Sequence, residues 1–276
     1  MASEKLFTEV FIRYPGFKTK AVTLSYDDGT VHDRRMIEAL NRYGLKCTFN
    51  LNSGTIGKPG KVSREEMVTL YAGHETAVHT LTHPHLNNLS LGQIAYQVTE
   101  DRKNLEEIFQ RPVEGMAYPF GLTETPGQVD ALRSCGIRYA RTTVSTHGFS
   151  LPTDPLRWNP TCHHADPKLP ELVNTFLQPD DMEHPWRITC KLLYVWGHSD
   201  EFDGKWEDLE SVCRLLSGHD EVWYATNGEI IDYLEAYRRL RSTVDGRYLY
   251  NPSAASLYLH VADSDIIVEP GQTIHL

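Results

Sequence analysis

The segment AVTLSYDDGTVHDRRMIEAL, residues 21–40, decides the fold class of this chain. An apolar run leads directly into two adjacent aspartates, Asp27 and Asp28, and then into a glycine. A helical pattern begins a few residues later, at Asp33. A strand, a short turn and a helix in this order are typical of an α/β protein. Adjacent carboxylates at the end of a buried strand repel each other unless a positive group holds them, so this turn is a candidate functional site.

The same alternation of strand and helix continues along most of the chain. Strands are expected at 21–26, 46–51, 76–80, 115–119, 137–141, 191–196 and 222–226, and helices near 33–44, 63–73, 90–111, 125–135, 167–178, 205–217 and 228–241. Capping boxes support three of the helix starts, at Ser63 with Glu66, Ser90 with Gln93 and Thr125 with Gln128. Strands that are each separated by a helix pair in parallel, with the helices outside. We therefore predict an α/β barrel, closed or partly open, with a doubly wound open sheet as the alternative.

The last part of the chain has a different pattern. Residues 243–276 contain short alternating runs that are broken by Asn-Pro, Asp-Ser and Pro-Gly pairs. This pattern predicts a small β appendage that packs on the barrel and is too short to fold alone. The barrel is accordingly assigned to residues 1–242.

Composition limits the classes of partner. The 37 acidic residues outnumber the 27 basic ones, which argues against a nucleic acid or an anionic membrane as the main partner. No apolar stretch approaches the roughly 18 residues of a membrane span, and the N-terminus carries charges where a secretory signal has its apolar region. The chain is therefore expected to be cytoplasmic, although a chain without its signal peptide would look the same. The five scattered cysteines are expected to be buried thiols. Nothing in the sequence indicates an oligomeric state.

Polar side chains gather where the expected strands end. Asp27 and Asp28 follow the first strand, His79 and His83 end the third, and His198 ends the sixth. Ligands of α/β proteins bind at the carboxyl ends of the strands, where these side chains would meet. Two histidines and one carboxylate form the protein ligands of a hydrolytic zinc site, and one helical turn would place histidines four residues apart on the same side. Without the aspartates, a pair of ordinary surface histidines would be an equally good interpretation.

These motifs resemble those of the NodB-homology polysaccharide deacetylases, which are metal-dependent amide hydrolases on a distorted barrel of β/α units. SYDDG (25–29) is similar to the T-F-D-D motif of that family, and HTLTHPHLNNLS (79–90) to its histidine motif. LLYVWGHSDEF (192–202) occupies the place of its late leucine-histidine motif. The resemblance covers roughly residues 20–241 and implies a distorted barrel of seven β/α units.

The resemblance also implies roles for individual residues. Asp28, His79 and His83 would hold one divalent metal, Zn²⁺ in the first place, with Co²⁺, Mn²⁺ or Ni²⁺ as alternatives. Asp27 would be the catalytic base and His198 the catalytic acid. In the segment AYPFG (117–121), the backbone N–H of Phe120 would stabilise the oxyanion, and Tyr118 would contribute to substrate binding.

One position departs from the family pattern. The family usually has R-x-P-[YF]-G, in which the arginine orients the catalytic aspartate, but here Ala117 stands at the arginine position. The difference is typical of a less common bacterial branch of the family. Arg141, which ends the fifth expected strand, is a candidate replacement that the sequence alone does not place.

The expected function is the removal of N-acetyl groups from an amino sugar or oligosaccharide. The alternatives are a hydrolase of a non-sugar amide, such as an allantoinase-like enzyme, an O-acetyl esterase, and a non-catalytic sugar-binding relic. Several other residues have a functional and a structural interpretation: Asn50 and Asn52 (site or turn), Trp158 and Trp186 (sugar stacking or loop anchor) and Asp200 and Glu201 (tuning of His198 or solvation).

Overall fold

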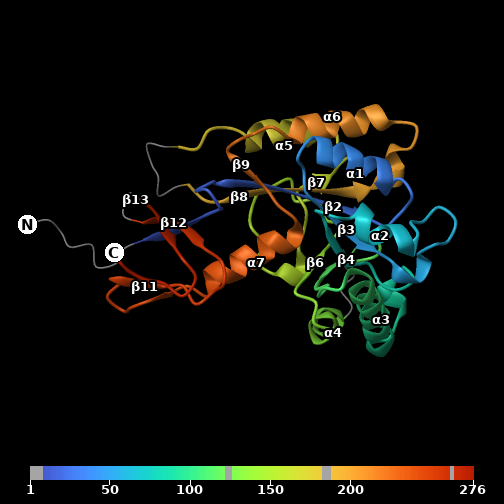
Figure 1. The fold of residues 1–276 in the computed structure, drawn as a ribbon, viewed down its shortest axis with the longest axis horizontal. Helices are drawn as coiled ribbons and strands as arrows, with labels where there is room; N and C mark the ends of the chain where they lie inside the picture. Colours follow the sequence, from blue (N-terminus) through green and yellow to red (C-terminus); the bar gives the residue numbers. More distant parts are fainter. Residues whose placement is uncertain (1–8, 122–125, 182–187, 262–263) are drawn as a thin grey trace, which may run out of the picture.

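A computed structural model describes residues 9–121, 126–181, 188–261 and 264–276. Its main feature is a curled parallel sheet in the order β6-β5-β4-β3-β2-β8-β7 (Figure 1). The strands are β2 (Lys20–Asp27), β3 (Cys47–Leu51), β4 (Glu75–Val78), β5 (Gly115–Ala117), β6 (Tyr139–Arg141), β7 (Cys162–His163) and β8 (Lys191–His198). Six of them were predicted from the sequence, and β7 was not, because two residues are too short to give a periodic signal.

β2 lies at the centre of this sheet, and all eight of its residues are buried. One edge of β2 pairs with β8 along its full length. The other edge pairs first with β9 (Val222–Tyr224) and then, nearer its carboxyl end, with β3. Between the end strands β6 and β7, the described residues contribute one isolated bridge, from Arg141 to Trp158. The sheet is therefore a partly open, half-barrel form of the predicted α/β barrel, and the predicted fold class is confirmed.

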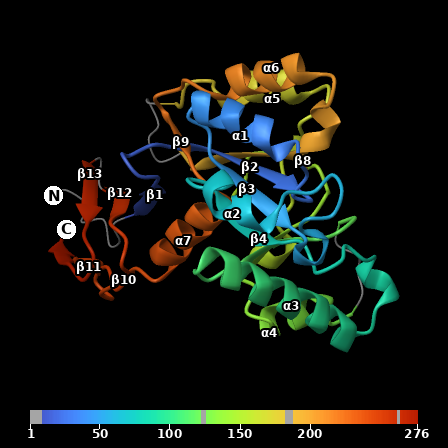
Figure 2. The same cartoon turned by 45° about the vertical axis from the view of Figure 1, so that its right-hand side comes forward.

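Helices cover both sides of the curled sheet (Figures 1 and 2). On one side lie α1 (Asp33–Arg42), α5 (Leu169–Phe176) and α6 (Trp206–Leu216), and on the other lie α3 (Leu91–Phe109) and α4 (Gln128–Ser134). α2 (Arg64–Leu70) and α7 (Asn227–Arg238) complete the set of seven predicted helices. Ser63 and Ser90 form the predicted capping boxes. Thr125 lies outside the described residues, and α4 begins only at Gln128, after Gly127.

The appendage consists of two small antiparallel sheets, β1-β12-β13 and β10-β11-β14. The strands are β1 (Val10–Arg13), β10 (Arg241–Ser242), β11 (Tyr248–Tyr250), β12 (Leu257–Val261), β13 (Ser264–Val268) and β14 (Thr273–His275). β1 comes from the N-terminal segment, which the sequence analysis assigned to the barrel. Leu257 and Leu259 of β12 belong to one apolar cluster with Tyr14 and with Tyr233 of α7. The appendage and the barrel therefore share a core.

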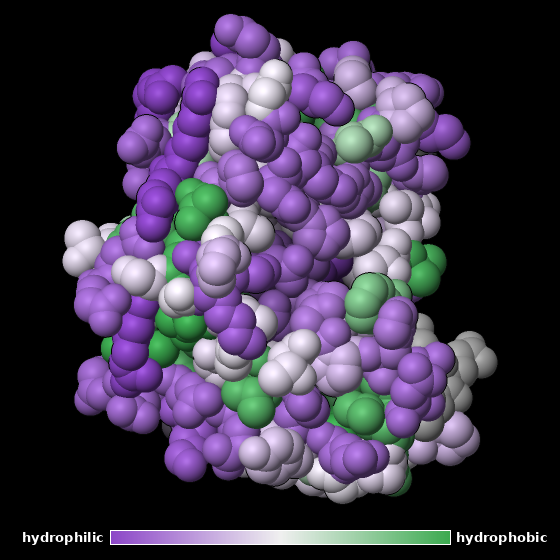
Figure 3. All heavy atoms as spheres, turned by 90° about the vertical axis from the view of Figure 1, so that its right-hand side faces the viewer, coloured by the Kyte–Doolittle hydropathy of each residue, from purple (hydrophilic) through white to green (hydrophobic). Residues whose placement is uncertain are grey.

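The two ends of the molecule have different characters. The appendage, with the C-terminus, lies at the end from which the strands of the parallel sheet start (Figure 1). The face on which these strands finish is largely hydrophilic and is hollowed near its centre (Figure 3).

Two smaller predictions concern helices and cysteines. Among the described residues, no helix is long and apolar enough to cross a membrane. All five cysteines are free thiols, and four of them are buried.

Candidate active site

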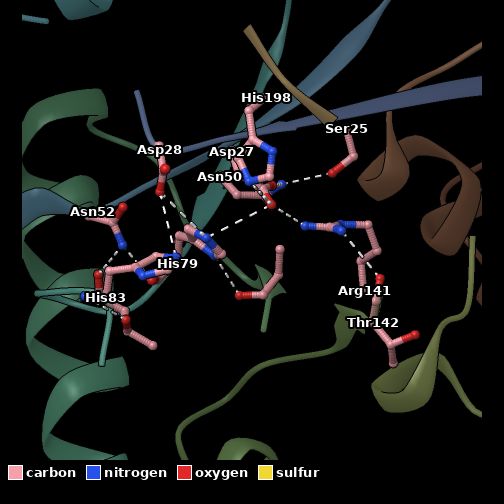
Figure 4. A network of polar contacts seen from close by, with 12 residues as sticks. Ser25, Asp27, Asp28, Asn50, Asn52, His79, His83, Arg141, Thr142 and His198 are labelled. Atoms are coloured by element: carbon pink, nitrogen blue, oxygen red, sulfur yellow. Dashed lines mark hydrogen bonds and ion pairs between the residues drawn. The ribbon is translucent and has the colours of Figure 1, made fainter. Parts of the chain in front are cut away.

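The strand register places three predicted polar residues side by side. Asp27 is the last residue of β2, and its register partners are Asn50 in β3 and His198 in β8. Asn50 Nδ2 donates to Asp27 Oδ1 over 2.8 Å, and His198 Nε2 lies 4.0 Å from Asp27 Oδ2. The three side chains converge because they sit at the same level of parallel strands (Figure 4).

Asp27 is buried and ion-paired. Its Oδ2 accepts a hydrogen bond from Nη2 of Arg141, whose side chain is also fully buried. Burial alone would raise the pKa of the Asp27 carboxyl, but the charge of Arg141, then those of His79 and His198, and the Asn50 hydrogen bond more than offset this effect. The pKa of Asp27 is therefore lowered, and the carboxylate stays ionised at neutral pH.

Arg141 is the residue that pairs with Asp27 in place of the arginine missing at position 117. In the sheet, Ala117 of β5 and Arg141 of β6 are direct register partners. The guanidinium thus reaches Asp27 from the strand next to the usual one. Arg141 also donates to the Thr142 carbonyl over 3.2 Å and stacks on Trp196 at 4.3 Å, and these contacts fix its direction.

Asp28 turns away from Asp27 and faces the two histidines. Asp28 Oδ1 lies 3.7 Å from Nε2 of His79 and 3.7 Å from Nε2 of His83. The ligand atoms of all three residues lie within 4.8 Å of one another. These separations are too long for hydrogen bonds between the three groups and suit ligands arranged around one ion.

The surroundings of His79 prepare it as a ligand. Its Nδ1–H donates to the Ala117 carbonyl over 2.8 Å, which leaves the lone pair of Nε2 directed at Asp28. Burial lowers the pKa of His79 to about 4, although Asp27 and Asp28 act in the opposite direction. The imidazole is therefore neutral at neutral pH, as a metal ligand must be.

Two side chains hold the backbone around His79. Asp101 of α3 accepts the His79 N–H at 3.0 Å, and Asn52 donates to the carbonyls of His79 and Thr80 at 2.5 and 2.9 Å. Asp101 was not among the residues predicted from the sequence. Its signal was available, because Asp101 is a charged residue on the buried stripe of α3 that includes Ile94, Val98, Leu105 and Ile108. Asn52, for which two interpretations were open, supports the histidine loop.

The two histidines are brought together by an irregular loop and not by the expected helical turn. Residues 79–83 form no helix, and Thr80 and His83 have positive φ values of 68° and 58°. The left-handed residues reverse the chain within four residues, so His79 and His83 face the same point with ring centroids 4.7 Å apart. The expected spacing was correct, but the expected backbone was wrong.

Left-handed backbone is concentrated at this site. Seven non-glycine residues among those described have positive φ, and four of them are Asp28, Thr80, His83 and Phe120. Such conformations are uncommon for residues with a side chain and gather at functional sites, where the surrounding structure imposes them.

His198 is supported from the side opposite Asp27. Its Nδ1 lies 3.6 Å from Oε2 of Glu201, and the same oxygen lies 3.1 Å from Nε2 of His163 and 3.4 Å from Nε2 of His164. Burial lowers the pKa of His198, but the Glu201 carboxylate and the charge of Asp27 outweigh it and raise the pKa to about 9. The imidazole therefore carries two protons at neutral pH. Glu201, for which a tuning role was one of two interpretations, contacts His198.

The structure divides the two residues expected from the segment AYPFG. Phe120 lies beside His83, with ring centroids 4.6 Å apart, and its backbone N–H makes no hydrogen bond among the described residues. Tyr118 does not reach the site with its side chain. It is buried, and its hydroxyl donates to the Leu156 carbonyl over 2.8 Å. The expected contribution of the Tyr118 side chain to substrate binding is therefore corrected to a core position.

The two tryptophans considered for sugar stacking do not line the described site. Trp158 is buried and packs against Tyr139 and Tyr194, so it anchors its loop in the core. Trp186 lies outside the described residues.

Comparison with known proteins shows which family the chain resembles. Residues 15–140 match the family model described as polysaccharide deacetylase. The match covers just under half of the 276 residues, so this part of the chain is similar to the polysaccharide deacetylase family. The matched range contains Asp27, Asp28, His79, His83 and Phe120, and it ends just before Arg141.

Individual proteins also resemble the chain, in sequence or in structure. Over 93 residues, 32% of this chain, the sequence is 33% identical to the peptidoglycan-N-acetylglucosamine deacetylase PgdA of Listeria monocytogenes, of which the match spans 19%. The fold is similar to that of a Mycobacterium smegmatis protein assigned to the polysaccharide deacetylases, with a TM-score of 0.60 and 17% identity over 85% of this chain and 96% of that one. It is also similar to the Xyl-CE4 domain of a multidomain xylanase from the hindgut metagenome of Trinervitermes trinervoides, with a TM-score of 0.54 and 15% identity over 79% and 92% of the two chains. At these identities the two structures show a shared fold.

Proposed function

We propose that this protein belongs to the polysaccharide deacetylase family and is a metal-dependent hydrolase that removes acetyl groups from the nitrogen of an amino sugar or oligosaccharide. The observation that carries the proposal is the division of the paired aspartates. Asp28 faces His79 and His83, whereas Asp27 faces Arg141 and His198. This arrangement supports a cation-binding role for Asp28 and a proton-transfer role for Asp27.

The donor set of Asp28, His79 and His83 fits a divalent metal such as zinc. Two imidazole nitrogens and one carboxylate oxygen face a common point, and the hydrogen bond from His79 to Ala117 has already fixed the tautomer that zinc requires. When bound, a metal of this kind supplies Lewis acidity, which lowers the pKa of a water molecule toward about 7 and polarises an acyl carbonyl.

Asp27 is the proposed proton acceptor. Its carboxylate is ionised and almost fully buried, and Arg141 and Asn50 fix both of its oxygens. A base that is already held in one orientation loses no rotational entropy in the reaction, so it accepts the proton of an attacking water efficiently.

His198 is the proposed proton donor to the leaving group. Its Nε2 lies 4.0 Å from Asp27 Oδ2, and the raised pKa of about 9 keeps the second proton on the ring at neutral pH. An amine leaves an acyl carbon only when it is protonated, whereas an alcohol leaves more easily. The support that His198 receives from Glu201 therefore favours an amide substrate over an ester.

Phe120 is the proposed donor to the developing oxyanion. Its N–H has no partner among the described residues, and its left-handed backbone, with φ of 60°, turns this segment back beside His83. A backbone donor of this kind is rigid and lies close to the proposed ligands, as oxyanion stabilisation requires.

Acetate release from a panel of substrates tests this proposal. The panel contains N-acetylglucosamine, chitooligosaccharides, peptidoglycan fragments and acetylated xylan, each with one equivalent of Zn²⁺ and after chelation. We expect release from an N-acetylated amino-sugar substrate, loss of activity on chelation and recovery when the metal is restored. Release from acetylated xylan alone would indicate the esterase. A folded, zinc-binding protein that releases no acetate from any substrate would indicate the sugar-binding relic, or an enzyme of a non-sugar amide.

The variant His198→Ala sharpens the choice between amide and ester. We expect a loss of roughly 10²–10⁴-fold on the amide, the usual contribution of one general acid, and a much smaller loss on an activated aryl ester. Equal losses on both substrates would remove His198 from the role of acid.

A further inference from the structure

A second group of metal-binding side chains lies beside the candidate active site. It consists of His163, His198 and Glu201, whose ligand atoms all lie within 4.8 Å of one another. Glu201 Oε2 is 3.1 Å from His163 Nε2 and 3.6 Å from His198 Nδ1. Ligands of a tetrahedral zinc ion, bound at about 2.0–2.1 Å, lie about 3.3 Å apart. The two separations from Glu201 are therefore close to those of a zinc site.

The fold places these three side chains together by strand register. β7 pairs with β8 so that His163 lies opposite Trp196. His198 follows Trp196 by two residues, so the two imidazoles project from the same face of the sheet. Glu201 belongs to the short 3-10 helix Ser199–Phe202 that begins directly after β8.

We propose that His163, His198 and Glu201 form a second, weaker site for a zinc-like divalent metal, and that a metal in this site removes His198 from its role as proton donor. The metal-binding part stands on the geometry alone. The inhibitory part rests on the proposed function, because it assumes that His198 is the acid.

The second site is weaker because its histidines are not prepared for a metal. Nδ1 of His163 accepts the Ala165 N–H at 3.2 Å, so in the metal-free protein Nε2 carries the proton and donates it to Glu201. A metal at Nε2 requires this proton to leave and the Ala165 bond to be given up, which costs about 1 kcal/mol for a hydrogen bond of this type. His79, by contrast, already directs a free lone pair at Asp28. Zinc binding gains far more than this difference, so the second site is weakened but not abolished.

An ion can reach the second site from solvent. The side chains of His163, His198 and Glu201 are 23%, 30% and 42% exposed. Glu201 also lines a cavity of about 850 Å³ between α5 and α6. Exposure on this scale permits exchange with free metal, as a reversible regulatory site needs.

His198 contacts both the candidate active site and the second metal-binding group, through different ring nitrogens. Nε2 faces Asp27, and Nδ1 faces Glu201. A metal on Nδ1 displaces the proton on that nitrogen and leaves the Nε2 proton on the ring. A neutral, metal-bound imidazole releases this remaining proton far less readily than an imidazolium does, so His198 becomes a poor proton donor to the leaving amine. Excess metal should therefore slow the reaction that the first equivalent makes possible.

Metal binding is tested by equilibrium dialysis of the full, metal-stripped chain against Zn²⁺. We expect two classes of site that differ at least tenfold in affinity. His163→Asn and Glu201→Gln should each weaken the second class at least tenfold and leave the first unchanged, and Asp28→Asn should do the reverse. The matched control is His147→Asn, which removes a partly exposed imidazole that is also paired with a carboxylate, that of Asp166. It should change neither class.

The inhibitory effect is tested by acetate release over the same range of Zn²⁺, with each variant normalised to its own maximum rate. The wild-type and His147→Asn proteins should rise with the first equivalent and fall as the second binds, and His163→Asn should show the rise without the fall. A single class of site in the wild type, or a second class that survives in both His163→Asn and Glu201→Gln, overturns the site. A second equivalent that binds without slowing the reaction overturns the inhibitory role. If no metal level gives activity, the proposed function fails, and the dialysis still decides the site.

Discussion

At the scale of single residues, Asp27 and Asp28 are neighbours in the chain with different surroundings. Asp27 is buried against a guanidinium, whereas Asp28 is partly exposed and faces two imidazoles. Lys61 donates to the backbone carbonyl of Asp28 and so fixes the turn that follows the two aspartates. Their mutual repulsion is offset because each carboxylate has a separate positive or cation-binding environment.

The first prediction separates the two aspartates. Asp28→Asn should weaken metal affinity, because a neutral amide replaces an anionic ligand, and excess metal should restore part of the activity. Asp27→Asn should retain the metal and lose activity on the order of 10²–10⁴-fold, which added metal does not restore. Metal analysis together with rates measures both. If both variants lose the metal alike, Asp27 is a ligand and the base lies elsewhere.

The second prediction concerns Arg141. Arg141→Ala should reduce kcat on the order of 10²-fold with the metal retained, because Asp27 loses the group that orients it. Since Ala117 lies opposite Arg141 in the sheet, the double variant Arg141→Ala with Ala117→Arg should recover part of this loss. Exogenous guanidinium should also rescue the single variant. An Arg141→Ala protein with wild-type kcat, or with a loss that neither change reduces, would show that Arg141 has no part in orienting Asp27.

The third prediction concerns the alkaline limit of activity. The pKa of His198 is raised to about 9 because the Glu201 carboxylate and Asp27 outweigh the effect of burial. Glu201→Gln removes a negative charge beside the imidazolium, so the ring should lose its second proton at a lower pH. We expect the basic limb of kcat/KM, measured with one equivalent of metal, to move down by on the order of one pH unit. A basic limb that does not move would exclude control by Glu201.

The polar residues at the ends of the strands were predictable from the sequence. The contacts that these side chains make with one another were not. The motif spacing indicated Asp27, Asp28, His79, His83, Phe120 and His198, and the structure brings these residues together. The pairing of Arg141 with Asp27 depends on the register of β6 against β5, which no local pattern encodes. Tyr118 was misplaced for a similar reason, since the face on which a side chain lies depends on where the strand ends.

At the scale of elements, α1 is tied to the segment that follows β8. Asp33, the first residue of α1, is fully buried and accepts hydrogen bonds from Ser199 at 2.5 Å and from Tyr71 at 2.7 Å. Thr30 and Ser199 are also linked, over 2.9 Å. The turn that carries the paired aspartates is thus connected to the residue that directly follows His198.

The fourth prediction is that Asp33 makes folding stability dependent on pH. Burial raises its pKa to about 7, although the hydrogen bonds from Ser199 and Tyr71 oppose the shift. The folded state therefore favours the protonated form. This contribution to stability is complete below about pH 4 and is lost as the pH rises through about 7, with about 1.4 kcal/mol for each unit of pKa shift.

Asp33→Asn, which cannot ionise, should remove this dependence. The free energy of unfolding of the metal-free variant, relative to that of the wild type, should increase steadily between pH 4.5 and 7.5. Asp101, whose pKa burial also raises to about 7, acts in the same direction in both proteins and so cancels in the difference. Parallel stability curves, measured by denaturant titration, would contradict the assignment.

The helices and the longer strands were predictable because each carries a full period of apolar residues. The stripe of α3, for example, runs from Ile94 to Ile108, over about four turns. Two features of the sheet were not predictable, because they depend on contacts between distant segments. They are the short strand β7 and the pairing of one edge of β2 with both β9 and β3. The loop that carries His79 and His83 was wrongly expected to be helical, since spacing alone does not reveal left-handed residues.

At the scale of the whole molecule, the appendage is joined to the barrel through a common core. β1 and β12 pair along four residues, and Tyr233 of α7 bonds to the backbone of both Arg13 and Tyr258. The division of the chain at 242 and 243 remains a proposal about sequence organisation. The shared contacts predict that the two parts unfold together.

The fifth prediction tests this coupling. Leu259→Ala, at a fully buried position of β12, should lower the free energy of unfolding by about 2–5 kcal/mol and should move the whole transition. Ile267→Ala in the adjacent β13, where the side chain is 38% exposed, is the control and should cost less than about 1 kcal/mol. Circular dichroism follows all elements at once. A separate early transition, with the barrel transition unchanged, would show that the appendage unfolds independently.

The left-handed residues around the site also bear on the history of the chain. Backbone in such conformations costs of order 1–3 kcal/mol at each position, a large part of the margin that keeps a domain folded. Random mutation in a lineage that had stopped catalysing would tend to replace these residues with glycine or to relax the loops, since nothing would select against the gain in stability. Positions 28, 80, 83 and 120 instead carry Asp, Thr, His and Phe. The chain thus carries strained backbone at the candidate site where glycine would relieve it, as expected if these four side chains are needed there.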